Sequence, residues 1–307
     1  MHRIGFPVAG LLIAFCAAAR AGAGDSLRTR LAWQIALDRA GFSPGVIDGR
    51  AGPKLERATR EYQHAHGLEA TGLLDQPTAS ALAVRPEEAI TTCTILPADL
   101  AQVGPLPTGW VEKSKLKRLA YPSLRSMLAE RFHCSRALLA WLNPGLDTTQ
   151  LKPGDRINVP AISSVPPVTR ASWIDIDLTH KVVRVFGADG NLVGLLCCSV
   201  AADESKLPSG RARVAVICEN PSYTFDPKKW PEVKGIDRKL LIPAGPRNPV
   251  GLCWIGLSLH GYGMHGTPSP ELIGKTGSHG CLRLTNWDAL RLARMVRIGT
   301  PVSFSVH

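Results

Sequence analysis

The chain contains Ser278-His279-Gly280-Cys281-Leu282-Arg283, and His265, in Met264-His265-Gly266-Thr267, lies sixteen residues before that cysteine. A free thiol has a pKa of about 8.5, so it is mostly protonated at neutral pH unless a base or a positive charge lies close. His265 and His279 are the candidate bases. In an extended segment His279 and Cys281 face the same side, whereas folding must bring His265 to the sulfur. The pairing predicts acyl transfer by a cysteine nucleophile, which requires an ionised, accessible sulfur within reach of one imidazole.

The neighbours of the cysteine suit the same chemistry. Gly280 lets the backbone pass close to a bound carbonyl, so the N–H groups of Gly280 and Cys281 are candidates for an oxyanion hole. Arg283, two residues after Cys281, would face the same way. Its planar guanidinium fits a carboxylate, which predicts a substrate with a free acid near the scissile bond.

His-Gly-Thr, a gap rich in Gly and Pro, and then Ser-His-Gly-Cys-Leu-Arg-Leu resemble the signature of the L,D-transpeptidase (YkuD-type) family. The loop at residues 242–251 is also similar, and the resemblance extends from about residue 173 to the C-terminus. It implies that Cys281 is the nucleophile and that His265 accepts and returns the proton. Residues 207–210, Leu-Pro-Ser-Gly, differ from the usual Thr-Pro-x-Gly, so local substrate contacts stay open. The expected contacts with substrate or oxyanion come from Ser278, His279, Gly280 and Arg283.

The same residues allow other interpretations. A lone cysteine is more often a small buried hydrophobe than a catalyst, so the prediction depends on the surrounding motif. His265, His279 and Cys281 could ligate zinc, but structural zinc takes four ligands and no fourth has suitable spacing. We therefore predict no metal site, and the family chemistry requires no cofactor. His279 either shapes its loop through a hydrogen bond or acts directly.

The N-terminus predicts export. Residues 1–23 read as a signal peptide, with small-residue cleavage sites after Ala21 and Ala23, and the apolar run is too short for a comfortable membrane span. Removing it takes away Arg3 and Arg20 and no acidic residue, so the formal charge falls from +11 to +9. This excess favours an anionic envelope polymer. No nucleic-acid motif is recognisable. We expect a protein of the periplasm or cell wall without a stable membrane anchor.

Without the leader and Cys281, six cysteines remain, which allow 15 pairings. An oxidising compartment makes disulfides plausible, but the spacing selects no partners. Cys197 and Cys198 are adjacent in an expected strand, so they should face opposite sides. The six are Cys93, Cys134, Cys197, Cys198, Cys218 and Cys253.

Residues 25–84 predict a small helical domain, because Leu27, Leu31 and Ile35 recur at helical spacing and a second apolar stripe follows Pro53. The segment resembles the three-helix peptidoglycan-binding domain. The alternative is a packing domain without a ligand. The matching residues are Asp48-Gly49, Gly52-Pro53, Tyr62-Gln63 and Gly67-Leu68 through Gly72.

Residues 89–162 predict two helices, the second ending before Asn143-Pro144, and a closing strand that ends at Pro160. The end of this segment resembles a LysM domain, which implies a βααβ unit. Its opening departs from the pattern, with Tyr121-Pro122-Ser123-Leu124 in place of Gly-Asp-Thr/Ser-Leu. Glycan binding and simple packing are both open.

Residues 168–307 predict the catalytic domain. Ile174, Ile176 and Leu178 alternate with polar residues, and strands should follow at 182–186 and 192–200. A helix should be capped by Asn286 and stop at Gly299. The whole chain is therefore expected to be a multidomain α+β protein, whose catalytic domain is a mainly antiparallel β-sandwich or barrel.

The resemblance implies a peptidoglycan L,D-transpeptidase that forms a thioester with a tetrapeptide stem, releases D-alanine and makes a 3-3 cross-link. The acceptor stays open between a stem amine, a lysine of an envelope lipoprotein, and water, which would make the protein a carboxypeptidase. The rivals are a non-catalytic wall-binding protein and a secreted cysteine peptidase of broader specificity. The sequence does not determine which residue orients His265. It does not determine the oligomeric state either.

Overall fold

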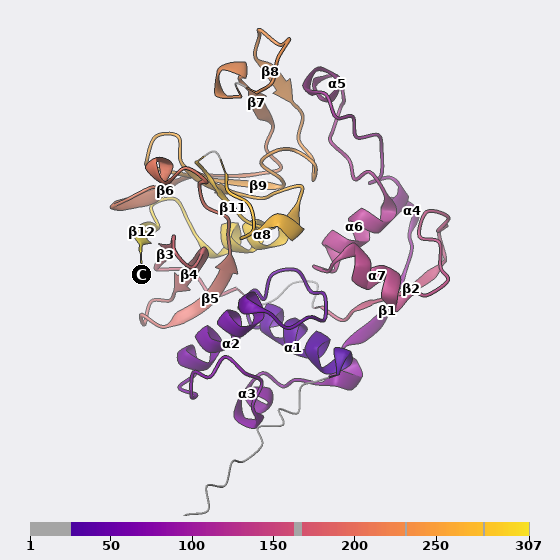
Figure 1. Cartoon of the computed structure of the whole chain (residues 1–307), viewed down its shortest axis with the longest axis vertical. Helices are drawn as coiled ribbons and strands as arrows, with labels where there is room; N and C mark the ends of the chain where they lie inside the picture. Colours follow the sequence, from indigo (N-terminus) through magenta and orange to yellow (C-terminus); the bar gives the residue numbers. More distant parts are fainter. Residues whose placement is uncertain (1–25, 163–167, 231, 279, 307) are drawn as a thin grey trace, which may run out of the picture.

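The computed structural model describes residues 26–162, 168–230, 232–278 and 280–306 (Figure 1). The predicted signal peptide and His279 lie outside the described residues. Among the described residues, no helix has the length and apolarity needed to cross a membrane.

Three helices form the N-terminal part: α1 (Leu27–Arg39), α2 (Pro53–Ala65) and α3 (Gln76–Ala81). The Ser26 and Asp75 side chains cap α1 and α3 by accepting hydrogen bonds from N–H groups of the first turn. Pro53 begins α2, where its missing N–H costs no helical hydrogen bond. The buried Gln63 amide donates to Thr71, to the Leu73 carbonyl and to Thr78, which ties the α2–α3 loop to α2.

The middle part has strands at both ends, and β1 (Ile90–Thr94) pairs antiparallel with β2 (Arg156–Pro160). The two predicted helices are α6 (Leu124–Arg131) and α7 (Arg136–Leu142). The helices α4 (Pro97–Leu100) and α5 (Trp110–Ser114) were not predicted, because short helices carry too little periodic pattern to recognise. A short 3-10 turn, η1 (Pro86–Glu88), precedes β1.

The unexpected segment around α5 leaves the middle part and packs on the hairpin formed by β7 (Tyr223–Phe225) and β8 (Leu240–Ile242) (Figure 1). The Trp110 ring stacks on Phe225 with centroids 4.4 Å apart. The Leu119 N–H donates to the Ala244 carbonyl at 2.9 Å. Residues from both parts therefore share one small apolar cluster.

The catalytic part is one continuous eight-stranded sheet in the order β11-β10-β9-β6-β12-β3-β4-β5. Two neighbouring pairs, β10–β11 and β3–β12, are parallel, and the other pairs are antiparallel. Its elements are β3 (Trp173–Asp177), β4 (Val182–Phe186), β5 (Leu192–Cys197), β6 (Arg211–Glu219), β9 (Cys253–Leu257), β10 (Gly263–His265), β11 (Leu282–Arg283), β12 (Pro301–Ser305) and α8 (Asn286–Met295). Short 3-10 turns lie at η2 (Glu204–Lys206), η3 (Pro227–Lys229) and η4 (Pro270–Leu272).

The predicted meander of three strands is confirmed as β3, β4 and β5, because alternation along Ile174 and Ile176 places apolar side chains in the core. The expected sandwich or closed barrel is corrected to a single curled sheet. The C-terminal strand β12 lies between β6 and β3 and joins the two halves, whose inner faces share one core with α8. Such long-range pairing is not visible in local patterns.

The predicted cap of α8 is wrong by one residue. Thr285 caps the helix by accepting a hydrogen bond from the Asp288 N–H at 3.1 Å, and the helix ends at Met295, before Gly299. Asn286 is buried and bonds to other parts of the molecule instead.

Buried polar contacts join the three parts where α1, α6 and α8 meet. Asp38 from α1 accepts from Arg291 of α8 at 3.2 Å and lies 3.0 Å from His133, which follows α6. The His133 ring stacks on Trp287 with centroids 4.9 Å apart. Ser43 donates to Asp288 at 2.8 Å. This interdomain junction fixes the parts relative to one another.

The seven described cysteines are all free thiols. Cys197 and Cys198 are both buried, and neither is bridged.

Candidate active site

Four residues align across adjacent strands at one edge of the sheet. Cys218 of β6 is opposite Trp254 of β9, Trp254 is opposite His265 of β10, and His265 is level with Arg283 of β11. Neighbouring strands lie about 4.8 Å apart, so these residues form one row. The alternating residues Met264 and Leu282 are fully buried in the core, which directs His265 and Arg283 to the opposite face.

Cys281 lies two residues before Arg283 and shares that face. Extending the parallel register by one residue puts Cys281 beside Gly263, which makes His265 its diagonal neighbour. Both side chains line the same pocket. The fold therefore brings together the two residues on which the sequence prediction depended.

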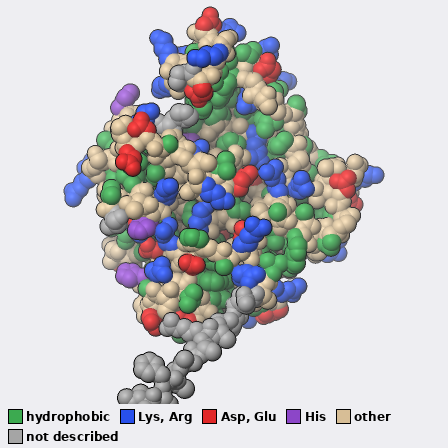
Figure 2. Space-filling view, viewed as in Figure 1, with side chains coloured by type: hydrophobic (Ala, Val, Ile, Leu, Met, Phe, Trp, Pro, Cys, Tyr) green, Lys and Arg blue, Asp and Glu red, His purple; other side chains and the backbone are tan. Residues whose placement is uncertain are grey.

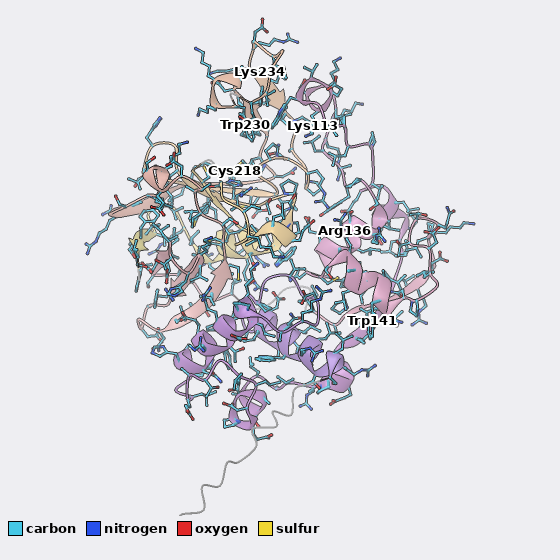
Figure 3. All side chains as sticks on the ribbon, in the orientation of Figure 1. Lys113, Arg136, Trp141, Cys218, Trp230 and Lys234 are labelled. Atoms are coloured by element: carbon cyan, nitrogen blue, oxygen red, sulfur yellow. The ribbon has the colours of Figure 1, made fainter. Side chains whose placement is uncertain are left out.

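A pocket of about 970 Å³ opens over this face. The β7–β8 hairpin and its connection form one wall, and Figure 3 labels Cys218 on the sheet and Trp230 on that wall. Lysines from η2 and η3 give the pocket a positive rim. Its lining includes Lys206, Cys218, Tyr223, Lys228, Lys229, Trp230, Trp254, His265, Ser278, Gly280, Cys281 and Arg283.

His265 is held as a neutral base. Only 7% of the residue is exposed, and its Nδ1 lies 2.7 Å from the Gly266 carbonyl, which can only accept, so Nδ1 carries the proton and Nε2 keeps its lone pair. Burial lowers the pKa of His265 to about 4, the hydrogen bond to Gly266 opposes this shift, and the positive charge of Arg283 adds to it. The Trp254 ring lies parallel to the imidazole, with centroids 5.7 Å apart.

The thiol of Cys281 is also held in its neutral form. Burial raises its pKa, and a backbone hydrogen bond with Gly263 and the charge of Lys229 only partly offset that effect. The Sγ atom lies 3.7 Å from the Gly261 carbonyl. The expectation of an ionised sulfur is corrected: both pKa shifts favour a thiol and a neutral imidazole, so the thiolate must form as the proton moves.

Ser278 and Gly280 shape the loop before Cys281. The Gly280 N–H donates to the Ser278 hydroxyl at 3.2 Å, and Ser278 is tied through its backbone to Val200 and Ala202. Gly280 has φ +153°, a conformation that favours glycine, and a Cβ there would point into open space. The Gly280 N–H could donate to an oxyanion only after its hydrogen bond to the Ser278 hydroxyl is broken.

Arg283 lines the pocket but already holds part of the chain. Its Nη2 donates to the Thr276 carbonyl at 3.0 Å, to the Thr276 hydroxyl at 3.2 Å and to the Gly277 carbonyl. The guanidinium therefore orders the loop in front of Cys281. A role toward a substrate carboxylate remains a prediction.

Some residues of the site were not anticipated from the sequence. Trp254 lies over β10, where a Cβ on Gly263 would stand 2.6 Å from its ring, so the glycine is required for the ring to reach His265. Tyr223 lines the same pocket as Cys281: burial raises the pKa of Tyr223, and a charge on Cys281 raises it further. No spacing in the sequence links residues this far apart.

A hydrogen-bonded chain supports His265 from behind. The Asn286 Oδ1 accepts from the Leu252 N–H at 3.0 Å and lies so close that a Cβ on Gly266 would stand 2.2 Å away. The Asn286 amide donates to the buried carboxyl of Glu130, from the middle part, at 2.8 Å. Glu130, a side chain of the middle part, therefore holds Asn286 against Gly266. The carbonyl of Gly266 is the group that orients His265.

Comparison with known proteins shows what this chain is similar to. A family model described as the L,D-transpeptidase catalytic domain (YkuD) matches residues 171–303, and one described as a putative peptidoglycan binding domain matches residues 29–82. The putative L,D-transpeptidase YkuD of Bacillus licheniformis is 31% identical over 183 residues, which cover 60% of this chain and 93% of that protein.

The probable L,D-transpeptidase YbiS of Escherichia coli is 32% identical over 167 residues, which cover 53% of each protein, so the chain spans about half of that relative. A solved L,D-transpeptidase of Xylanimonas cellulosilytica aligns over 90% of this chain and 92% of its own with 16% identity and a TM-score of 0.37. The family-model match and the identity to the Bacillus licheniformis protein show that the chain belongs to the YkuD-type L,D-transpeptidase family.

Proposed function

We propose that the protein is a peptidoglycan L,D-transpeptidase of the cell wall. The observation that carries the proposal is the diagonal placement of Cys281 and a neutral His265 in one pocket with a positive rim. The family match of residues 29–82 to a putative peptidoglycan binding domain supports a wall polymer as the substrate. We place the protein in the periplasm or cell wall on the same grounds.

In the acylation step, the Nε2 of His265 takes the proton of the Cys281 thiol as the sulfur attacks the carbonyl of the third residue of a tetrapeptide stem. The tetrahedral intermediate collapses, the C–N bond to the terminal D-alanine breaks, and His265 returns the proton to the leaving amine. A low pKa of His265 suits the second half of this step, because a weakly basic imidazole gives up its proton readily.

In the second step, the amine of another stem attacks the thioester, passes a proton to His265, and expels the Cys281 thiolate, which regains that proton. The product is a 3-3 cross-link. A lysine of an envelope lipoprotein or a water molecule could attack the thioester in the same way. The product depends on which nucleophile reaches the acyl-enzyme. The Lys206, Lys228, Lys229 and Arg283 side chains around the pocket suit the carboxylates of the donor stem.

The test incubates the mature protein with purified disaccharide-tetrapeptide and weighs both protein and products. We expect an acylated protein, released D-alanine and a cross-linked dimer, all absent with Cys281→Ala. Cys218→Ala is the matched control, because this thiol lines the same pocket but lies two strands from His265. It should keep the activity.

Each product distinguishes one alternative. Loss of D-alanine without a dimer would indicate a carboxypeptidase. An unchanged substrate together with retained binding to cell walls would indicate a non-catalytic wall protein. Activity that survives in Cys281→Ala would refute the nucleophile assignment.

A further inference from the structure

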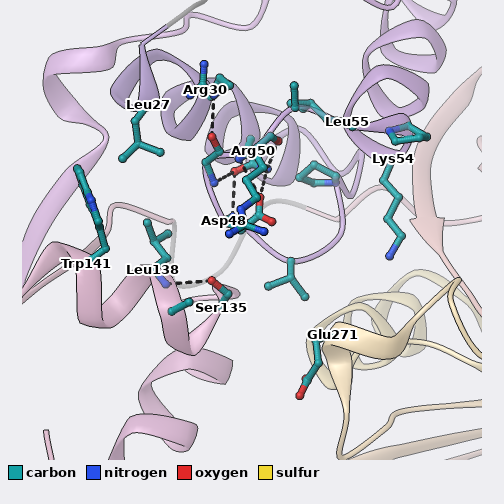
Figure 4. A pocket seen from close by; sticks show the side chains of 18 of the residues that line it. Leu27, Arg30, Asp48, Arg50, Lys54, Leu55, Ser135, Leu138, Trp141 and Glu271 are labelled. Carbon is teal, nitrogen blue, oxygen red and sulfur yellow. Dashed lines mark hydrogen bonds between the residues drawn. The ribbon is translucent and has the colours of Figure 1, made fainter.

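A second pocket, of about 660 Å³, lies where all three parts of the molecule meet, away from the catalytic pocket. Its walls are the α1–α2 loop of the N-terminal part, helix α7 of the middle part, and residues Glu271 and Lys275 of the catalytic part (Figure 4). Helix α7 presents Leu138 and Trp141 to one side of the pocket, and Asp48 and Arg50 lie across from them. We call this pocket the interdomain groove.

Trp141 is the most informative side chain of the groove. It is 61% exposed, although α7 buries Leu138, Leu139 and Leu142 in the domain core. A neighbouring hollow of about 680 Å³ is also lined by Trp141 and Leu27. The indole therefore stands between two hollows, where it offers a large apolar surface to a ligand that runs past it.

The walls of the groove are fixed before any ligand arrives. The Gln34 amide holds the loop by bonding to the Asp48 N–H at 3.1 Å and to the Gly49 N–H at 2.8 Å. Lys54 donates to the Ile273 carbonyl at 2.5 Å, which joins the N-terminal and catalytic parts. The Arg136–Glu271 pair, at 3.4 Å, crosses from α7 to the catalytic part. A rigid groove loses little conformational entropy on binding.

The charges of the groove select an anionic ligand. Four cationic side chains and two carboxylates line it, and the adjoining hollow adds Arg28. An exposed indole beside cations suits a polymer of sugar rings that carries carboxylates, because the C–H faces of the sugars pack on the ring and the acids pair with Lys and Arg. The charged residues are Arg30, Arg50, Lys54, Lys275, Asp48 and Glu271.

We propose that the interdomain groove binds a stem-bearing glycan strand of peptidoglycan, with Trp141 as the platform for a sugar ring. The groove would hold the polymer while a stem reaches Cys281. This inference rests on the proposed function for the choice of polymer, and it assigns wall binding to a surface built jointly by three parts, not by the N-terminal domain alone.

The experiment measures binding in the Cys281→Ala background, so that its result does not depend on catalysis. Purified sacculi are titrated with protein that carries Trp141→Ala, Trp141→Phe or Ile298→Ala. Ile298 is 68% exposed and lies outside the groove, so it is the matched control for loss of an exposed apolar side chain. Loss of an aromatic anchor should weaken binding about tenfold or more. The phenylalanine variant should retain most of the affinity, and Ile298→Ala should retain all of it.

Equal binding by Trp141→Ala and the parent would overturn the proposal, and so would an equal loss in Ile298→Ala. The charge argument is tested with Arg50→Glu, using chitotetraose as the neutral probe and a disaccharide-tetrapeptide as the anionic one. We expect weaker binding of the anionic fragment only. Weakening of both probes alike would refute recognition of the carboxylates.

Discussion

Two histidines of this molecule, the buried His265 and the partly buried His133, have opposite surroundings. His265, in the catalytic pocket, bonds to a backbone carbonyl and faces the positive charge of Arg283. His133, in the interdomain junction, lies 3.0 Å from the carboxylate of Asp38 and stacks on Trp287. The first environment keeps an imidazole neutral and available to a thiol. The second uses an imidazole to help hold a buried carboxylate, which ties the three parts together.

The role of each histidine depends on its hydrogen-bond partner as well as on its burial. The carbonyl partner of His265 leaves its Nε2 free to accept a proton, whereas the carboxylate partner of His133 ties that ring into the junction. The two regions are also linked, because Glu130 from α6, close to His133 in the chain, reaches Asn286 behind His265. The following predictions test how far the regions differ and how strongly they are coupled.

The largest effect is expected at the junction. Burial raises the pKa of Asp38, but the charges and hydrogen bonds of His133 and Arg291 outweigh it and hold the pKa below its ordinary range. Asp38→Asn removes the nearer carboxylate from the buried Arg291 and leaves it the longer 3.8 Å contact with Asp288, which should lower the free energy of unfolding by about 3 kcal/mol. Urea denaturation measures this difference.

Glu271→Gln is the control for Asp38→Asn, because it breaks a pair whose side chains are about half exposed. It should cost under about 1 kcal/mol. Equal losses in the two variants would contradict the structural role assigned to the junction.

The second prediction concerns the acid limb of the pH–rate profile, where the acylation rate falls as the pH is lowered. Burial lowers the pKa of His265 to about 4, so the free base is the major form at pH 5, whereas a histidine with an ordinary pKa near 6.5 would be only about 3% neutral there. Acylation requires the neutral imidazole, so the acylation rate should fall only as the pH falls through about 4.

The measurement is the single-turnover rate of Cys281 acylation between pH 3.5 and 7, with near-UV circular dichroism to verify that the protein stays folded. The rate should be flat above about pH 5. A limb near pH 6.5 would contradict the burial of the imidazole and its bond to the Gly266 carbonyl.

A smaller effect is expected where the two regions meet. Glu130→Leu removes the acceptor of both Asn286 and the Tyr121 hydroxyl, so the backbone at Gly266 loses its support and His265 shifts. A displacement of a fraction of an ångström should slow acylation about tenfold. Glu130→Gln keeps an acceptor oxygen and should restore most of the rate.

The readout that separates positioning from stability is the pH profile, because a loosened His265 would move its acid limb toward the ordinary value. If Glu130→Leu loses stability but keeps the rate and the limb of the parent, the coupling between the regions is refuted.

The sequence determined the parts of the molecule that depend on neighbours along the chain. Alternation in residues 174–200 predicted three strands, and two apolar stripes at helical spacing, the second after Pro53, predicted two N-terminal helices. The signature around His265 and Cys281 predicted a nucleophile and its base, and both side chains line one pocket in the structure. These signals are local because side-chain direction repeats every two or 3.6 residues.

Only the tertiary structure decided the rest. The pairing of β12 between β6 and β3 made one curled sheet, and the packing of α5 on the β7–β8 hairpin joined distant parts. The protonation of His265 and Cys281 depends on burial and on charges from other strands, while Glu130 meets Asn286 across 156 positions of sequence. Such contacts leave no periodic trace, because what selects them is the shape and polarity of surfaces that exist only after folding.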